Sequence, residues 1–113
     1  MVWRSTGVAE VALKVDSPLE VHMDGDDVVL VRLTGGIHAF EVYCPHEGGV
    51  LAEGHVSGES IVCPLHGAEY NLRTGAIEAD PDGIRPPTGN VRGLSTYPVK
   101  LVAGIVHVDL DAT

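Results

Sequence analysis

Short runs of apolar residues alternate with turn residues along the whole chain. The runs are about four to eight residues long and are separated by glycine, proline and aspartate, which is the pattern of β-strands joined by tight turns. We expect strands at residues 8–13, 19–23, 28–33, 37–42, 53–56, 60–63, 69–72, 76–79, 95–102 and 105–110. No segment repeats apolar residues at the spacing of one helix face. The pattern predicts an all-β protein.

Four short turns join neighbouring strands. Gly35-Gly36, Ser57-Gly58, Thr74-Gly75 and Ala103-Gly104 each lie between two expected strands. A turn of this length makes its two strands antiparallel, as a β-hairpin. We therefore expect one antiparallel domain over residues 1–113, whose middle third is an insertion into a framework of strands.

The composition is that of a folded protein outside the membrane. The chain has 113 residues, of which 44% are hydrophobic, and this is enough for one core. No apolar run reaches the roughly 18 residues that a membrane helix needs, and the start of the chain lacks the features of a secretion signal. We expect a cytoplasmic protein without a membrane partner. The formal net charge of −9 also argues against nucleic acid as a partner.

Half of the acidic residues are concentrated in the middle of the chain. Residues 41–82 hold eight of the sixteen acids and one base, Arg73, so this segment carries a net charge of −7. One explanation is solubility. The other is electrostatic steering toward a basic partner, which accelerates association at low ionic strength.

Two pairs of metal-ligand residues follow expected strands. Cys44 and His46 are two positions apart, Cys63 and His66 are three positions apart, and sixteen residues separate the pairs. The two cysteines alone would permit a disulfide, but the histidine close to each one indicates metal ligands. Two thiolates and two imidazoles suit either zinc or a mixed-ligand iron–sulfur cluster.

The sequence around these ligands resembles the two cluster loops of Rieske proteins. The first loop reads C-P-H-E-G-G from Cys44, and the second reads C-P-L-H-G from Cys63. Further on, Y-N-L-R-T-G from Tyr70 resembles the F-D-x-x-T-G stretch of Rieske ferredoxins, and Y-P-V from Tyr97 resembles their closing strand. The resemblance covers about residues 28–110.

The resemblance implies one Rieske-type [2Fe–2S] cluster, with Cys44 and Cys63 on one iron and His46 and His66 on the other. It also implies a sandwich of antiparallel sheets, with a smaller cluster-binding subdomain at about residues 43–80 inserted between framework strands. Neutral imidazoles in place of two thiolates make the cluster less negative, so adding an electron costs less and the potential rises. In the family the histidines lie at the surface, which makes them the expected exit for the electron.

Three positions separate the chain from the high-potential Rieske proteins of respiratory complexes. Those proteins have a disulfide where this chain has Gly49 and Leu65, and a serine where it has Ala68. The differences imply a soluble, low-potential ferredoxin, and we predict a potential of roughly −150 mV. Tyr70 is the opposing feature: its hydroxyl would raise the potential by donating to a cysteine sulfur, unless it is only a core aromatic.

Other residues near the predicted site leave open questions. The segment 80–93 is longer than is usual in the family and either shields the cluster or is a surface excursion, with Arg85 and Arg92 as candidates for pairing with the acidic segment. The remaining histidines lack a second ligand at close spacing, and we do not expect them to bind metal; two of them alternate with apolar residues in strands and are expected to face solvent. The four are His22, His38, His55 and His107, and the two in strands are His38 and His107.

The resemblance implies a one-electron carrier rather than an enzyme. We expect a monomer that takes electrons from a flavin-dependent, NAD(P)H-dependent ferredoxin reductase and passes them to a terminal oxygenase of an aromatic ring-hydroxylating dioxygenase system. One alternative is the Rieske-type small subunit of a nitrite reductase or a related enzyme. Another is a structural zinc domain, which would be colourless, whereas a Rieske protein is red-brown.

Overall fold

A computed structural model describes residues 2–45, 48–89 and 92–111 of the chain. The described residues form eleven strands and three short 3-10 turns. The strands are β1 (Arg4–Ala9), β2 (Leu19–Met23), β3 (Asp26–Leu33), β4 (Gly36–Phe40), β5 (His55–Ser57), β6 (Ser60–Val62), β7 (Glu69–Asn71), β8 (Ile77–Ala79), β9 (Thr96–Tyr97), β10 (Val99–Val102) and β11 (Ile105–Val108). The 3-10 turns are η1 (Glu10–Ala12), η2 (Leu51–Glu53) and η3 (Pro81–Gly83).

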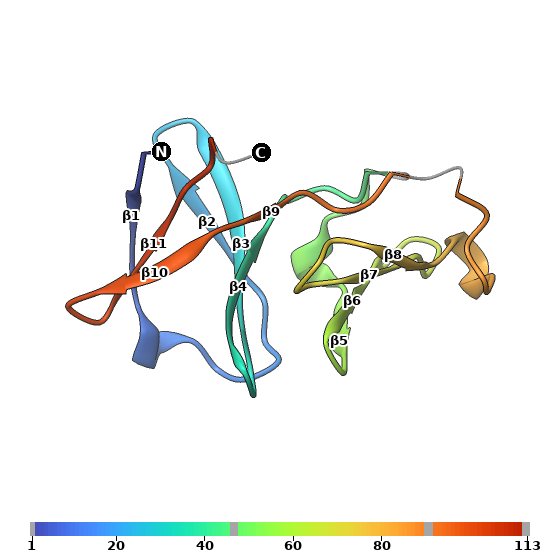
Figure 1. Cartoon of the computed structure of the whole chain (residues 1–113), viewed down its shortest axis with the longest axis horizontal. Helices are drawn as coiled ribbons and strands as arrows, with labels where there is room; N and C mark the ends of the chain where they lie inside the picture. Colours follow the sequence, from blue (N-terminus) through green and yellow to red (C-terminus); the bar gives the residue numbers. More distant parts are fainter. Residues whose placement is uncertain (1, 46–47, 90–91, 112–113) are drawn as a thin grey trace.

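Three antiparallel sheets are arranged side by side along the long axis of the molecule (Figure 1). The first has the strand order β1-β11-β10, the second β2-β3-β4-β9 and the third β5-β6-β7-β8. The third sheet is one continuous stretch of chain between β4 and β9. The prediction of an antiparallel sandwich with an inserted smaller subdomain is therefore confirmed.

The central strand β3 is buried on both faces. Val28 and Leu30 point into the core between the first two sheets. Val29, Val31 and Leu33 alternate with them and point into the core shared with the inserted sheet. Successive side chains of a strand point to opposite faces, so an uninterrupted apolar run marks a strand with a core on each side. The middle sheet thus supports the inserted subdomain directly.

The first strand lies earlier than its sequence indicates. A strand was expected at residues 8–13, but β1 ends at Ala9 and the chain then turns through η1. Pairing with β11 determines the strand: Thr6 Oγ1 donates to Val106 O at 2.7 Å, and Glu10 N donates to Gly104 O at 2.9 Å. These contacts are distant in sequence, so the local apolar pattern did not indicate them.

The expected strand at 95–102 is two strands separated by Pro98. β9 pairs with β4 in the middle sheet, whereas β10 pairs with β11 in the first sheet. Proline has no N–H to donate to a ladder, and it occurs where a strand leaves one sheet for another. The chain therefore returns from the inserted subdomain through the middle sheet before it closes the sandwich.

Among the helical segments of the described chain, none is long and apolar enough to cross a membrane.

Candidate metal centre

Two buried cysteines meet in the inserted half of the molecule. Cys44 lies beyond β4 and Cys63 directly follows β6, and each is 2% exposed. Burial raises the pKa of the Cys63 thiol above its ordinary value, and a hydrogen bond with the neighbouring Cys44 adds to the shift. The raised pKa favours the protonated Cys63 thiol in the metal-free protein, and metal binding has to release that proton.

The two cysteine loops have the same backbone hydrogen bonds. Cys44 N donates to Gly49 O at 2.8 Å, and Gly48 N donates to Cys44 O at 2.9 Å. In the second loop Cys63 N donates to the carbonyl five residues on, at 2.8 Å, and the N–H four residues on donates to Cys63 O at 3.1 Å. The loops are therefore structural equivalents that face each other.

One position of each loop requires a left-handed backbone. Gly48 has φ of +71° and Gly67 has φ of +78°, and both stand four residues after their cysteine. Residues with a Cβ rarely adopt this conformation. Glycine at the same offset in both loops is the sequence signal that would have revealed their equivalence.

The equivalence of the loops places the two predicted histidines at different positions. His66 is the third residue after its cysteine and His46 the second, so His46 corresponds to Leu65 in the other loop. His66 is exposed, in contrast to the cysteines. His46 lies outside the described residues. Within residues 2–45, 48–89 and 92–111, no group of three or more His, Cys, Asp or Glu side chains is close enough to hold a metal ion. The described structure brings together Cys44 and Cys63 of the four predicted ligands.

Leu65 packs across the gap between the loops. A Cβ on Gly49 would lie 2.9 Å from Cys63 Sγ and 3.0 Å from Leu65 Cγ, so glycine is needed there for space. Gly49 and Leu65 occupy the two positions at which high-potential Rieske proteins have their disulfide. An apolar contact joins the loops here instead.

Tyr70 is both a core residue and a hydrogen-bond partner of the site. Its side chain is fully buried, and its Oη lies 3.2 Å from Cys44 Sγ. Burial raises the pKa of the Tyr70 hydroxyl far above its ordinary value, and the hydrogen bond to Cys44 adds to the shift. The hydroxyl keeps its proton, so it donates to Cys44 whenever that sulfur is a thiolate. The two interpretations of Tyr70 are therefore compatible.

Both arginines of the segment 80–93 pair with acids of the middle segment. Arg85 Nη2 lies 2.5 Å from Glu69 Oε2, and Arg92 makes two contacts of 2.8 and 2.9 Å with the Glu41 carboxylate. Asp82 N also donates to the carbonyl of His66. The segment is thus fastened beside the second cysteine loop. Sequence reasoning had left these contacts open.

Two of the other histidines differ from the expectation. His38 was expected to face solvent but is half-buried between the framework and the inserted sheet, and burial lowers the pKa of its imidazole. His107 is also half-buried. His22 is exposed and lies 2.8 Å from Asp27, and His55 is exposed. Along β11 the burial alternates, and His107 lies with Ile105 on the less buried face, opposite Val106 and Val108.

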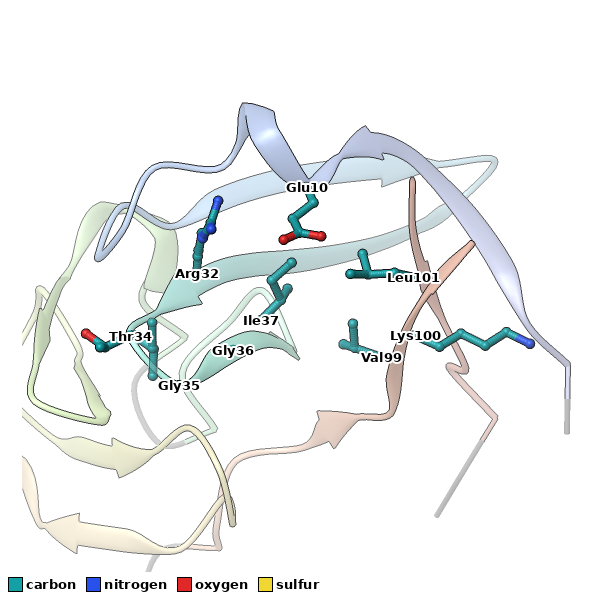
Figure 2. A pocket seen from close by; sticks show the side chains of 10 residues that line it. Glu10, Arg32, Thr34, Gly35, Gly36, Ile37, Val99, Lys100 and Leu101 are labelled. Atoms are coloured by element: carbon teal, nitrogen blue, oxygen red, sulfur yellow. The ribbon is translucent and has the colours of Figure 1, made fainter. Parts of the chain in front are cut away.

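A hollow in the described surface lies away from the cysteines, over the framework sheets. It has a volume of about 470 Å³ and is lined by Glu10, Arg32, Ile37, Val99 and Leu101 among others. Figure 2 shows the Glu10 carboxylate over this hollow and Lys100 extending away from it. The Lys100 ammonium instead lies 4.5 Å from the centre of the Trp3 ring. The lining contains no cysteine or histidine, so it is not the metal centre.

Comparison with known proteins agrees with this geometry. The Rieske [2Fe-2S] domain family matches residues 6–98. The ferredoxin component of the naphthalene 1,2-dioxygenase system of Pseudomonas aeruginosa is 32% identical over 93 residues, which are 82% of each chain. The oxygenase component of 3-ketosteroid-9-alpha-monooxygenase from Rhodococcus rhodochrous is 35% identical over 75% of this chain, which spans only 22% of that protein.

Solved structures show the same fold. The ferredoxin of carbazole 1,9a-dioxygenase from Nocardioides aromaticivorans superposes with a TM-score of 0.77 at 25% identity, over 96% of this chain and 97% of the other. A putative NADH-dependent nitrite reductase small subunit from Mycobacterium tuberculosis gives a TM-score of 0.77 at 24% identity, over 99% and 97%. The second likeness concerns the fold alone.

The fold and the paired cysteine loops define an iron–sulfur electron carrier. The chain belongs to the Rieske [2Fe-2S] domain family, and it is an electron-transfer component rather than a catalytic one. Its relatives imply one Rieske-type [2Fe–2S] cluster. The donors fit such a group, because two buried thiols lie together between equivalent loops and an exposed imidazole follows one of them.

Proposed function

We propose that Cys44, His46, Cys63 and His66 hold the cluster. The observation that supports this proposal is the equivalence of the two cysteine loops, which have the same backbone hydrogen bonds around Cys44 and Cys63. The bound cluster takes up and releases one electron at a time. The chain holds both thiolates away from water and leaves His66 exposed, so the histidine side is the route by which electrons enter and leave.

Three side chains near the ligands set the properties of the site. Tyr70 donates a hydrogen bond to Cys44, which stabilises added negative charge on that sulfur. Leu65 packs against Gly49 across the gap between the loops. Ala68 is fully buried and has no hydroxyl to donate. We expect a potential near the low end of the Rieske range, roughly −150 mV.

The electron carrier serves, in our proposal, a multicomponent oxygenase. A flavin-dependent, NAD(P)H-dependent reductase supplies the electron, and a terminal oxygenase, most simply an aromatic ring-hydroxylating dioxygenase, receives it. The ferredoxin of the naphthalene dioxygenase system supports this pathway because it and this chain match over 82% of the length of each. The protein acts as a cytoplasmic monomer in this proposal.

The ligand proposal is tested on the purified protein. We expect about two iron and two sulfide per chain, a red-brown colour and a Rieske-type electron paramagnetic resonance spectrum after reduction. Cys63→Ser should lose the cluster, and His66→Cys should retain visible absorption but lower the potential, because a thiolate adds negative charge. Zinc without iron in the wild-type protein would show that the site is a structural zinc domain.

The pathway is tested by reconstitution. The protein is mixed with the reductase and terminal oxygenase of the Pseudomonas aeruginosa naphthalene system, in place of that system's ferredoxin. NADH-dependent product formation that requires this protein supports the proposal, and its absence at every protein concentration contradicts it. A nitrite reductase small subunit is the second candidate; it predicts co-purification with a large subunit and nitrite-dependent NADH oxidation instead.

A further inference from the structure

A clamped loop lies beside the exposed ligand. Residues 81–89 and 92–93, which we call the clamped loop, lie between β8 and β9, and residues 81–83 form η3 at the end of the inserted sheet far from the framework (Figure 1). Near its start, Asp82 N donates to His66 O. The backbone of the loop is therefore joined to the very residue that we propose as the exposed ligand.

Two ion pairs hold the loop beyond this contact. Arg85 pairs with Glu69 at 2.5 Å and also donates to Glu78 O at 3.4 Å. Arg92 pairs with Glu41, whose carboxylate accepts a further hydrogen bond of 2.6 Å from Ser95 N. Ile84 lies between Asp82 and Arg85, which are both held by these contacts, so its side chain is presented in a defined place.

The clamped loop presents an apolar side chain to solvent. Ile84 is 52% exposed, and its carbonyl accepts from Asp80 N at 3.0 Å, which closes the turn that carries Asp82. Leu65, next to His66, is 55% exposed. Two large apolar residues thus lie exposed on segments that are hydrogen-bonded to each other through His66. Exposed apolar groups around a functional group mark a contact surface for another protein.

The segment that contains this surface has a negative net charge. Residues 41–93 contain eight acids and three arginines, a net formal charge of −5. Two of those arginines are already neutralised by Glu41 and Glu69. Asp82 is exposed next to the apolar pair and has no ion-pair partner within the described residues. A partner that fits this surface has an apolar centre and a basic rim.

We propose that the clamped loop selects the electron acceptor, through docking of a terminal oxygenase on Ile84 and Leu65 with Asp82 at the rim. This inference rests on the proposed function. Electron transfer requires close approach to the cluster, and the cysteine side of the site is buried, so the acceptor must contact the protein beside His66. Ile84 and Leu65 are the apolar groups that such an acceptor meets.

The apolar contact is tested with a pair of matched variants. Ile84→Asn alters the clamped loop. Leu101→Asn alters a similarly exposed apolar residue, 47% exposed, on β10 of the framework. The second-order rate of electron transfer from the reduced protein to the naphthalene dioxygenase oxygenase of Pseudomonas aeruginosa is measured by stopped flow. We expect Ile84→Asn to slow transfer by roughly tenfold, the effect of about one buried aliphatic side chain, and Leu101→Asn to leave it within about twofold.

The charge is tested with a second pair. Asp82 and Asp24 are both exposed and both have positive φ, of 68° and 42°, a conformation that asparagine tolerates. Asp82→Asn should slow transfer at low ionic strength and flatten its salt dependence. Asp24→Asn removes the same charge elsewhere and should do neither.

The outcomes separate this inference from the proposed function. If the wild-type protein passes no electrons to the oxygenase, the proposed function fails. If it does, but Ile84→Asn equals Leu101→Asn at an unchanged reduction potential, the docking proposal alone fails. Slower reduction by the reductase with unchanged transfer to the oxygenase would also overturn it, because the loop would then select the donor.

Discussion

The side chain of Leu65 lies where a Cβ on Gly49 would have to be placed. Such a Cβ would be 3.0 Å from Leu65 Cγ and 2.9 Å from Cys63 Sγ. The contact joins the two ligand loops without a covalent bond, and it leaves no room for even one additional methyl group.

Gly49→Ala should therefore impair the site. The added methyl group forces Leu65 or Cys63 to move, and overpacking of this kind costs about 1–3 kcal/mol. We expect a lower iron content per chain and faster loss of visible absorption in urea. Gly35→Ala is the matched control, because a Cβ there meets nothing within 4 Å and the backbone φ is not positive. Equal behaviour of the two variants would show that the contact does not matter.

Tyr70→Phe should lower the reduction potential. The hydroxyl that donates to Cys44 Sγ at 3.2 Å stabilises the reduced, more negative site more than the oxidised one. If that difference is about 1 kcal/mol, the potential falls by roughly 40 mV, since 59 mV corresponds to a tenfold change for one electron. Protein-film voltammetry measures it. Tyr43→Phe, at an exposed tyrosine next to Cys44, should change nothing, and a similar shift there would refute the explanation.

The pKa of His38 should lie below the ordinary histidine value of 6.5, and the pKa of His22 should lie above it. Burial lowers the pKa of His38, with Glu59 raising it and Arg73 lowering it further, whereas a hydrogen bond to Asp27 raises the pKa of His22. The unfolded chain then binds a proton at His38 more readily than the folded one, so His38 reduces stability as the pH falls below about 6.5.

An NMR titration of the imidazole Cε1 protons follows both residues in one sample. His38→Gln identifies one signal and should flatten the loss of stability on acidification. A pKa of His38 equal to or above that of His22 would contradict the prediction.

Arg92→Met should weaken the attachment of the clamped loop to Glu41. The Glu41 carboxylate loses both contacts with Arg92 but still accepts from Ser95 N, now without its counter-charge. Because Arg92 is more than half exposed, the effect is small, about 1 kcal/mol or less. Exchange of the Ser95 amide hydrogen should accelerate by up to roughly fivefold, and high salt should reduce the difference. Arg73→Met should not affect this amide.

The sequence revealed the parts of the fold that local signals determine. Gly35-Gly36 and Ala103-Gly104 lie between strands that do pair, and β2 covers the residues expected for it. The start of β1 and the break at Pro98 depended on which sheet each strand joins, and that choice is made by residues far along the chain.

For the candidate site, residue types predicted chemistry better than they predicted contacts. The cysteines were recognised from their flanks, and the structure brings them together. Spacing could not show that Leu65 covers Gly49 or that Asp82 N binds His66 O, because these contacts join different loops. The ligand set itself and the low potential remain predictions.

The chain leaves the middle sheet after β4 to form the inserted sheet and re-enters the middle sheet at β9, which pairs with β4. Ala39 pairs with Tyr97 and Phe40 with Thr96, so β4 and β9 keep the two ends of the insertion side by side. A segment attached in this way is a module: its entry and exit are fixed by two paired strands, and its core is completed by β3. Such modularity allows one redox unit to work either as a small carrier or within a larger chain, and this chain corresponds to 82% of a ferredoxin and to 22% of an oxygenase component.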